Sequence, residues 1–275
     1  MGFWNGSVSP VGLIAGTGEY PLVFAEAFSS QKKKLIVIGV EGLADKRLGE
    51  WAAEAHYLAL GDLDGLIALL KKKQIKEVVF AGGIPKKEIY NPSFQQDTQA
   101  KGFMQGVRNK GDDHLIRAFG LFLKARCGVS VMDPRGLLKS ILATKGNMTR
   151  RTLSPVEMAD IKFGFRIAKE IGRMDIGQTV IVRSGVVLAV EALEGTNQAL
   201  RRGAELGHGE VTAVKVAKPK QDLRFDLPCV GFETLSIMAE NGIRVLAVEA
   251  GKTIMLNKET LIKTANEKNL TLVGL

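Results

Sequence analysis

Short apolar runs alternate with helical patterns along the first half of the chain. The runs have the length of buried strands, and they occupy residues 11–15, 35–40, 55–60, 77–83 and 128–132. Between them, apolar positions recur at helical spacing, which predicts helices at residues 20–31, 62–73 and 112–126. Because strands and helices that alternate in this way build a parallel sheet covered by helices, this half is predicted to be a Rossmann-like α/β domain.

The second half follows a different pattern. Residues 179–192 form two apolar runs around a Ser184–Gly185 turn, which predicts a β-hairpin. Ser154, Pro155 and Glu157 predict a capped helix start just before it. The fold class is therefore α/β with two domains: a Rossmann-like parallel-sheet domain at 1–135, a linker at 136–153 and a mixed α/β domain at 154–275 that carries most candidate catalytic acids.

Composition narrows the class of protein. The 275 residues are 45% apolar and 24% charged, as in ordinary globular proteins. No apolar run approaches the roughly 18 residues of a membrane-spanning helix, and the first ten residues lack the pattern of a signal peptide. The two cysteines do not form a disulfide framework or a metal-ligand spacing. The chain is therefore expected to be cytoplasmic.

The net charge of +9 indicates an anionic partner. The basic residues are dispersed along the chain, however, and the lysine runs at 32–34 and 71–73 close predicted helices, where they solvate the surface. With only 6% aromatic residues, a platform that stacks nucleic-acid bases is not expected. Nucleic acid is therefore not expected as the partner. The anionic partners that remain are a membrane surface and a phosphorylated substrate.

The loop after the first predicted strand contains Gly16, Thr17 and Gly18. Glycines there let backbone N–H groups approach an anion at a helix N-terminus. Pro21 stands where a dinucleotide-binding loop has its third glycine, although Glu41 follows the second strand as a ribose-binding acid would. The loop is either a structural turn or a ligand loop, and NAD is the less favoured ligand.

Acidic residues also cluster at the ends of other predicted elements. Asp112, Asp113 and His114 begin a helix, where they either cap it or hold an ion. Glu191, Glu194 and Glu249 follow apolar strands, where a carboxylate is costly unless it is paired or functional. Arg201 and Arg202 follow the first two of these acids, and an arginine pair can clamp phosphate or form a surface ion pair.

Residues 218–228, KPKQDLRFDLP, are the most highly charged loop between a predicted strand and a predicted helix. Loops at this position commonly carry the chemistry of α/β proteins. Asp222 and Asp226 are four residues apart and could face one site if the backbone turns between them. The loop is either a salt-bridged turn or part of a site for an anion.

Taken in order, eight segments resemble the LpxI family over nearly the whole chain. The distinctive ones are DIGQ at 175–178, VEALEGT at 190–196 and KPKQDLRFDLP at 218–228. LpxI proteins are the UDP-2,3-diacylglucosamine pyrophosphatases of lipid A biosynthesis in Gram-negative bacteria. The resemblance implies a Mg²⁺-dependent enzyme of two domains that clasp the substrate and cut it into UMP and 2,3-diacylglucosamine 1-phosphate (lipid X).

The resemblance, together with the residues above, assigns a site. Asp222 and Asp226 are expected to bind Mg²⁺ and orient the attacking water, with Arg224 and Glu191 as further catalytic residues. The expected substrate-binding residues are Gly16, Thr17, Gly18, Gly82, Gly83, Asp113, His114, Gln178, Glu194, Gly195, Thr196, Lys215, Lys218 and Gln221.

Two alternatives stay open from the residues alone: an NAD(P)-dependent oxidoreductase, and a nucleotide-binding module without catalysis. The implied substrate is an amphiphile, so the basic chain is expected to associate peripherally with the anionic inner membrane of a Gram-negative bacterium. The sequence does not fix the oligomeric state, for which a homodimer is one option. It does not fix the preferred acyl-chain length either.

Overall fold

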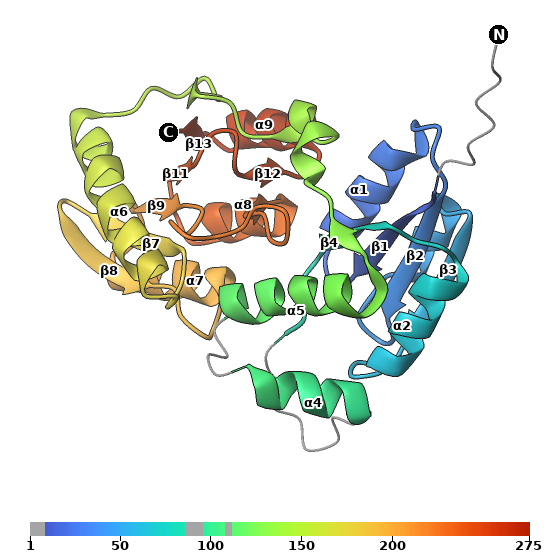
Figure 1. Cartoon of the computed structure of the whole chain (residues 1–275). Coiled ribbons are helices and arrows are strands. Elements are labelled where there is room, and N and C mark those ends of the chain that lie inside the picture. The colour runs from blue at the N-terminus through green and yellow to red at the C-terminus, as the bar shows by residue number, and fades with distance from the viewer. Residues whose placement is uncertain (1–8, 86–87, 89–95, 108–111) are drawn as a thin grey trace, which may run out of the picture. The chain divides into compact units, whose positions relative to one another are not determined.

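The structure is a computed structural model that describes residues 9–85, 88, 96–107 and 112–275, except the side chains of Asp112 and Asp113. The chain divides into two compact units (Figure 1). Met1–Leu137 and the short segment Arg224–Asp226 form the first unit, whereas Leu138–Leu223 and Leu227–Leu275 form the second. Each unit has its own sheet.

The sheet of the first unit has five strands in the order β3-β2-β1-β4-β5, and every pair is parallel. Its inner strands are runs of apolar residues, and Val11, Leu13, Val37 and Val79 are fully buried. Such continuous apolar runs are typical of parallel strands that are covered on both faces. The strands are β1 (Val11–Ala15), β2 (Leu35–Val40), β3 (Glu54–Leu58), β4 (Glu77–Ala81) and β5 (Ser130–Val131).

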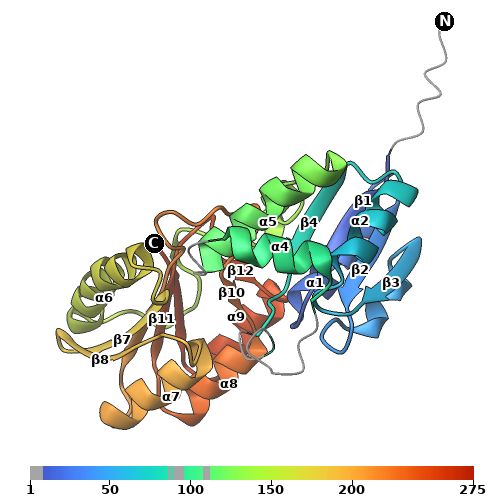
Figure 2. The same ribbon diagram turned by 60° about the horizontal axis from the view of Figure 1, so that its bottom comes forward.

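Helices connect these strands, and two of them, α2 and α4, start at an aspartate that caps them. The Asp62 carboxylate accepts a hydrogen bond from Gly65 N at 2.8 Å and so caps α2, and Asp97 caps α4 by accepting from Ala100 N at 2.7 Å. The helices are α1 (Tyr20–Ser29), η1 (Lys46–Glu50), α2 (Leu63–Lys72), α4 (Thr98–Gly106) and α5 (Asp112–Cys127) (Figure 2).

The strand order creates a switch point between β1 and β4. The chain leaves β1 toward β2 on one side of the sheet, whereas β4 and β5 lie on the other side. In sheets of this kind, ligands bind outside the carboxyl ends of the two strands at such a point. The loops that follow β1 and β4 are therefore the positions in this unit that the topology favours for a ligand.

The second unit has a mixed sheet of six strands in the order β6-β13-β11-β9-β7-β8. Strands β9, β11 and β13 are parallel, and β7 runs antiparallel to β9, so the start of β7 lies beside the end of β9. The predicted α/β class, with a Rossmann-like N-terminal and a mixed C-terminal domain, is confirmed. The strands are β6 (Gly146–Asn147), β7 (Thr179–Arg183), β8 (Val186–Val190), β9 (Thr212–Lys215), β11 (Val245–Val248) and β13 (Thr271–Gly274).

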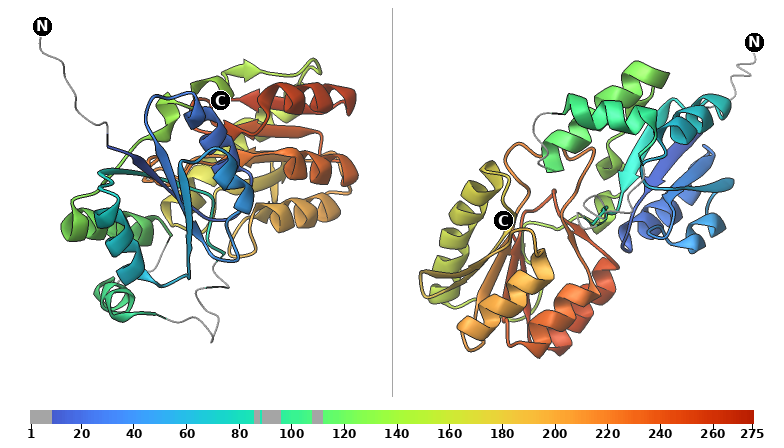
Figure 3. Two further views of the ribbon diagram at one scale, coloured as in Figure 1. Left: turned by 90° about the vertical axis from the view of Figure 1, so that its right-hand side faces the viewer. Right: turned by 90° about the horizontal axis from the view of Figure 1, so that it is seen from below.

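Helices cover both faces of this sheet (Figure 3). Ile161, Ala168 and Ile171 of α6 pack with Val180 and Val214 on one face. The helices of the other face bury Leu200, Leu235 and Leu261. The helices are α6 (Pro155–Arg173), α7 (Thr196–Leu206), α8 (Phe232–Glu240) and α9 (Lys258–Glu267), and the parallel pair β10 (Cys229–Val230) and β12 (Ile254–Met255) forms a small second sheet.

Two local predictions are confirmed. Ser154 and Glu157 form a capping box at the start of α6, with Pro155 in its first turn. Strands β7 and β8 form an antiparallel hairpin, and its Ser184–Gly185 turn has φ values of 49° and 77°. The stretch predicted as a linker, 136–153, begins at the end of η2 (Pro134–Gly136) and contains η3 (Lys139–Ile141) and β6.

Candidate functional site

Polar side chains gather at one edge of the second unit's sheet. This is the edge at which β8, β9 and β11 end and β7 begins, as the strand registers require. Gln178 precedes β7, Glu191 follows β8 and Lys215 ends β9. Backbone hydrogen bonds fix their relative positions, since Glu191 N donates to Thr179 O and Val216 N donates to Gln178 O, both at 2.9 Å.

Lys215, Thr196 and Glu191 form a chain of hydrogen bonds at this edge. Lys215 Nζ donates to Thr196 Oγ1 at 3.1 Å, and Thr196 Oγ1 donates to Glu191 Oε1 at 2.9 Å. Lys215 Nζ also donates to Cys229 O at 3.1 Å, and Gln178 N donates to Glu191 Oε2 at 3.3 Å. The structure thus brings four predicted site residues, Gln178, Glu191, Thr196 and Lys215, into one group.

The lysine of this group is a buried cation without a carboxylate partner. Lys215 is 7% exposed, and within the described part of the chain no carboxylate lies within ion-pair distance of its Nζ. A buried charge is costly unless it is paired. An ammonium group has three N–H bonds, and only two of them have partners among the described residues. The third can donate to an anion.

Helix α7 begins beside this lysine. Gly195 occupies its N-cap position with φ 83°, so that no capping side chain covers the first N–H groups of the helix. Free N–H groups at a helix N-terminus attract anions. Arg202 and Glu194 do not belong to this group, because Arg202 donates to Glu194 Oε1 and to Val190 O, both at 2.8 Å, at an exposed position. Of the two arginines predicted to clamp a phosphate, Arg201 and Arg202, the second therefore forms a surface ion pair with Glu194.

Glu249, at the end of β11, lies at the same edge and is 8% exposed. It accepts hydrogen bonds from Lys169 Nζ and Lys252 Nζ at 2.5 Å each, and from Ala217 N at 3.1 Å. Burial raises the pKa of this carboxyl group, but the two lysines lower it more, so that the pKa lies below its ordinary value of 4.5. The predicted strand-end carboxylate is thus paired.

This ion-pair network should make the stability of the protein pH dependent. Because the pKa of Glu249 is lower in the folded chain than in the unfolded chain, its stabilisation is complete above about pH 4.5 and is lost as the pH falls through the folded value. Urea denaturation should show that Glu249→Gln lowers the free energy of unfolding by about 1–3 kcal/mol at pH 7. The difference should shrink below pH 4.5, whereas exposed Glu205→Gln should have no such effect; a difference that grows at acid pH would contradict this.

The loop after β9 is held by a second ion pair. Lys218 Nζ lies 2.5 Å from Asp175 Oδ1, Lys218 N donates to Gln221 Oε1 at 2.8 Å, and Gln221 N donates to Lys218 O at 3.0 Å. Asp175 adopts a left-handed φ of 58°, and its other oxygen is buried without a partner within the described part of the structure. Lys218 and Gln221 therefore shape the turn that leads directly to Asp222, which is half-buried.

The segment Arg224–Asp226 of this loop belongs to the first unit. Phe225 is buried in its core, with its ring centroid 5.5 Å from that of Phe80 at the end of β4, whereas Arg224 and Asp226 are exposed. The guanidinium of Arg224 lies 5.6 Å from the Phe225 ring centroid. The backbone turns at 223–225, between the two aspartates. Asp222 is assigned to one unit and Asp226 to the other.

In the first unit, the predicted glycine residues lie together at the switch point. Thr17 N and Thr17 Oγ1 donate to Gly83 O at 2.9 and 3.0 Å. A Cβ atom at Gly16 would collide with Gly83 O, and one at Gly82, whose φ is 79°, would collide with Thr17 O. Glycine is required because the two loops touch through their backbones. Gly18, with φ 95°, faces open space.

The predicted site at the start of α5 is described only in part. His114 is exposed in the first turn of this helix. The side chain of Asp113 lies outside the described residues. Among the residues that the structure describes, no group of three or more His, Cys, Asp or Glu side chains could hold a metal ion. A cage made by the protein alone is therefore not present in that part of the chain.

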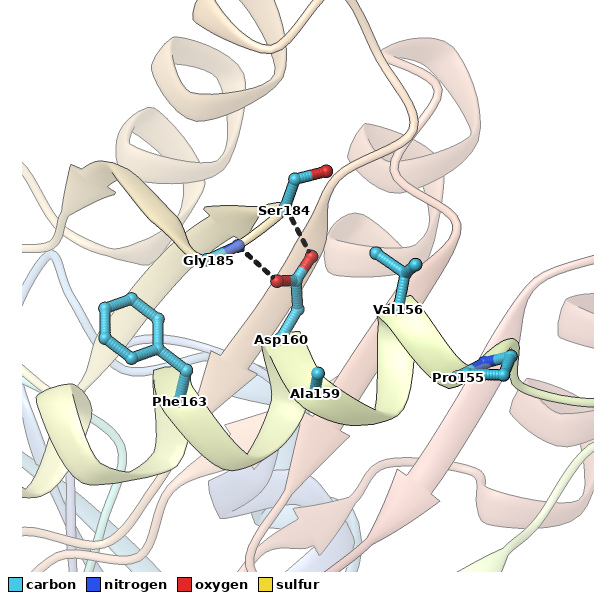
Figure 4. Close-up of a pocket in the computed structure, with 7 residues that line it drawn as sticks. All are labelled: Pro155, Val156, Ala159, Asp160, Phe163, Ser184 and Gly185. Atoms are coloured by element: carbon cyan, nitrogen blue, oxygen red, sulfur yellow. Dashed lines mark hydrogen bonds between the residues drawn. The ribbon is translucent and has the colours of Figure 1, made fainter.

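A shallow pocket lies between α6 and the turn of the β7–β8 hairpin (Figure 4). Apolar groups of α6 line it together with the Ser184–Gly185 turn, which lies at the opposite edge of the sheet from the Lys215 group. Both oxygens of buried Asp160 accept hydrogen bonds there, from Ser184 N at 2.8 Å and from Gly185 N at 2.7 Å. Asp160 thus fastens the hairpin turn to α6.

Asp160→Asn should therefore destabilise the protein without changing its chemistry. The amide can accept only one of the two N–H groups, and its own NH₂ group faces the other donor, which should lower the free energy of unfolding by about 2 kcal/mol. Thermal denaturation measures this, with exposed Glu205→Gln as the control. Activity per folded molecule should stay within about twofold of wild type; an unchanged melting temperature would contradict the role of Asp160.

Three residues that sequence reasoning did not select take part in these networks: Asp175, Lys169 and Lys252. Asp175 begins the DIGQ segment, from which only Gln178 was selected, so the motif contained a usable signal. Lys169 is 80 positions from Glu249 and meets it only through the fold, so no local pattern marks it, whereas Lys252 lies three positions after Glu249.

The sequence matches the models of one protein family in both halves of the chain. The LpxI N-terminal domain model matches residues 10–141, and the LpxI C-terminal domain model matches residues 144–273. The UDP-2,3-diacylglucosamine pyrophosphatase LpxI of Caulobacter vibrioides is 29% identical over an alignment of 276 positions that covers 96% of this chain and 96% of that one. The two domain models therefore follow each other along nearly the whole sequence.

Solved structures are only distantly similar. The biotin carboxylase domain of 2-oxoglutarate carboxylase from Hydrogenobacter thermophilus is 15% identical, with a TM-score of 0.28 over 72% of this chain and 41% of that one. A nucleoside-diphosphate-sugar epimerase from Pseudomonas aeruginosa is 12% identical, with a TM-score of 0.26 over 97% of this chain and 88% of that one. Scores this low carry no argument about fold or function.

Proposed function

This chain belongs to the LpxI family of UDP-2,3-diacylglucosamine pyrophosphatases, and from that premise we propose that it hydrolyses its substrate to UMP and 2,3-diacylglucosamine 1-phosphate (lipid X). The reaction belongs to lipid A biosynthesis. The comparisons give no support to the alternatives of an NAD(P)-dependent oxidoreductase or a non-catalytic nucleotide-binding module.

The observation that carries the proposal is the buried ammonium group of Lys215. It lies at the sheet edge where strands end, beside the uncapped N-terminus of α7, and it has no carboxylate partner among the described residues. A pyrophosphate supplies the negative charge that this position lacks. We assign a phosphate group of the substrate to Lys215 and the first N–H groups of α7, while the Thr196 hydroxyl group, which donates to Glu191 and accepts from Lys215, holds the ammonium group in place.

Hydrolysis requires a water molecule aligned with the phosphorus–oxygen bond that breaks, and charge stabilisation on two phosphoryl groups. We assign the orientation of the water to Asp222, which follows the turn held by Lys218 and Asp175. Arg224 is proposed to contact the departing phosphate. Water attacks one phosphorus atom, the bridging oxygen leaves with the other phosphate, and the two protons of the water pass to the products and solvent.

We propose Mg²⁺ as the cofactor, held by Asp222 and Asp226 together with substrate oxygens. This ion is commonly bound through one or two carboxylates together with phosphate oxygens of the substrate, which is the ligand set that the two aspartates and a pyrophosphate would supply. When bound, Mg²⁺ neutralises charge on the phosphate oxygens.

Removal of divalent cations should therefore stop turnover. Enzyme treated with EDTA and transferred to metal-free buffer should release UMP at less than about a hundredth of the original rate, because substrate charge is no longer neutralised. Added Mg²⁺ should restore the rate, which liquid chromatography of UMP measures. Full activity in EDTA would refute the metal assignment and leave the hydrolase assignment standing.

The glycine loops of the first unit are proposed to contact the nucleotide part of the substrate. Gly16, Thr17, Gly18, Gly82 and Gly83 lie at the switch point of a parallel sheet, where backbone N–H groups meet ligands. His114 and Asp113 remain proposed substrate contacts at the start of α5.

Access to an amphiphilic substrate also requires contact with the membrane that contains it. Among the residues that the structure describes, no helix is long and apolar enough to cross a bilayer. We propose a peripheral association with an anionic leaflet, driven by the net charge of +9 and weakened by salt.

A further inference from the structure

Three large apolar side chains are exposed beside the Lys215 group. Leu193 is 72% exposed, Met174 is 62% exposed and Ile176 is 45% exposed. Leu193 lies in a turn closed by the hydrogen bond from Gly195 N to Ala192 O at 3.2 Å, directly after Glu191 and Ala192. Met174 and Ile176 lie on the loop that joins α6 to Gln178.

The two loops that carry these side chains touch each other. A Cβ atom at Gly177 would collide with the carbonyl oxygen of Glu191, and Gln178 N donates to Glu191 Oε2 at 3.3 Å. Met174, Ile176 and Leu193 therefore belong to one region at the edge of the sheet, which we call the apolar rim. Large apolar side chains grouped in this way at the mouth of a polar site commonly mark an interaction surface.

Exposed basic residues lie beside the apolar rim. Arg173 is next to Met174, its side chain is 60% exposed, and it pairs with Glu170, whereas Arg202, with a side chain that is 51% exposed, pairs with Glu194 and donates to Val190 O. Lys220 is also exposed, and the neighbouring Pro219 packs near Gly172 at the end of α6. Apolar side chains next to exposed basic residues suit the surface of an anionic bilayer. The apolar side chains can enter the acyl region, while the basic groups stay at the level of the headgroups.

We propose that the apolar rim is the membrane-inserting surface of this enzyme, which places Lys215 and its neighbours next to the headgroup of a substrate that still lies in an anionic bilayer. The inference rests on the proposed function, because only an amphiphilic substrate makes such a surface useful. It goes beyond the general attraction of a basic protein, since it assigns binding to three named side chains on two loops.

Vesicle binding tests this surface without turnover. The probe is a substrate-free vesicle of phosphatidylcholine with about one third phosphatidylglycerol, and flotation measures the bound fraction. The test variant is Met174→Ser/Ile176→Ser/Leu193→Ser. The matched control is Val156→Ser/Met158→Ser/Val186→Ser, because these side chains are 56%, 45% and 59% exposed but lie near the shallow pocket at the opposite edge of the sheet.

The test variant should bind the vesicles at least about thirtyfold more weakly than wild type, and the control variant should bind within about threefold of it. A Leu193→Trp variant should in addition be quenched by brominated lipids more strongly than the parent, and Val156→Trp should not. Equal binding of all three proteins, equal loss in both triple variants, or no binding by wild type would overturn the inference. Each protein is also assayed on detergent-dispersed substrate, so that failure of the rim and failure of the hydrolase assignment are seen separately.

Discussion

Asp222→Ala should lower kcat by about a thousandfold or more, which is the scale of losing a contact that is made mainly in the transition state. Asp222 directly follows the turn that the Lys218–Asp175 ion pair and Gln221 hold in place, so the backbone that carries it is held before substrate binds. Substrate binding should survive, because the proposed phosphate contact through Lys215 is intact. Steady-state kinetics measures kcat, and calorimetry with uncleaved substrate measures binding.

Asp226→Ala is the matched comparison, since both aspartates belong to the same charged loop. If Asp222→Ala kept more than about a tenth of the activity while Asp226→Ala abolished it, the roles of the two residues would be exchanged. If both variants stayed active, the catalytic carboxylate would have to be sought at Glu191, Glu194 or the Asp112–Asp113 pair.

Lys215→Met should lower kcat/KM by about a hundredfold or more, because it removes the buried charge assigned to the phosphate. The free energy of unfolding should change by less than about 1 kcal/mol, since relief of the buried charge offsets the lost hydrogen bonds to Thr196 and Cys229 O. Kinetics and urea denaturation of the same preparations measure the two effects.

The control is Lys263→Met on the exposed face of α9, which should leave both quantities unchanged. Inorganic pyrophosphate should raise the melting temperature of wild type more than that of Lys215→Met. A Lys215→Met enzyme with wild-type kcat/KM would show that this lysine is a structural residue. Strong destabilisation with unchanged activity per folded molecule would lead to the same conclusion.

The fold could be predicted from the sequence because its signals are local. The apolar runs of β1, β2 and β4 and the helical spacing between them define the parallel sheet, and the capping box at Ser154 and Glu157 defines the start of α6. The hairpin was visible in the Ser184–Gly185 turn, where the left-handed φ values favour such residues.

The site could be predicted only in part, because its contacts join distant segments. The sequence indicated Glu191, Thr196 and Lys215 separately, but only the register of β7, β8 and β9 brings them together. The ion pair between Lys218 and Asp175 spans 43 positions, and that between Lys169 and Glu249 spans 80. Phe225 lies between charged residues in a loop, and no local pattern predicts that it packs in the core of the other unit.

The most direct test of the hydrolase assignment is the identity of its products. Purified protein is incubated with UDP-2,3-diacylglucosamine and Mg²⁺ in ¹⁸O-labelled water, and mass spectrometry follows the products. We expect UMP and 2,3-diacylglucosamine 1-phosphate in equal amounts, with the label in the lipid product if water attacks the phosphorus on the glucosamine side. Intact substrate after incubation, or its conversion without release of UMP, would contradict the account.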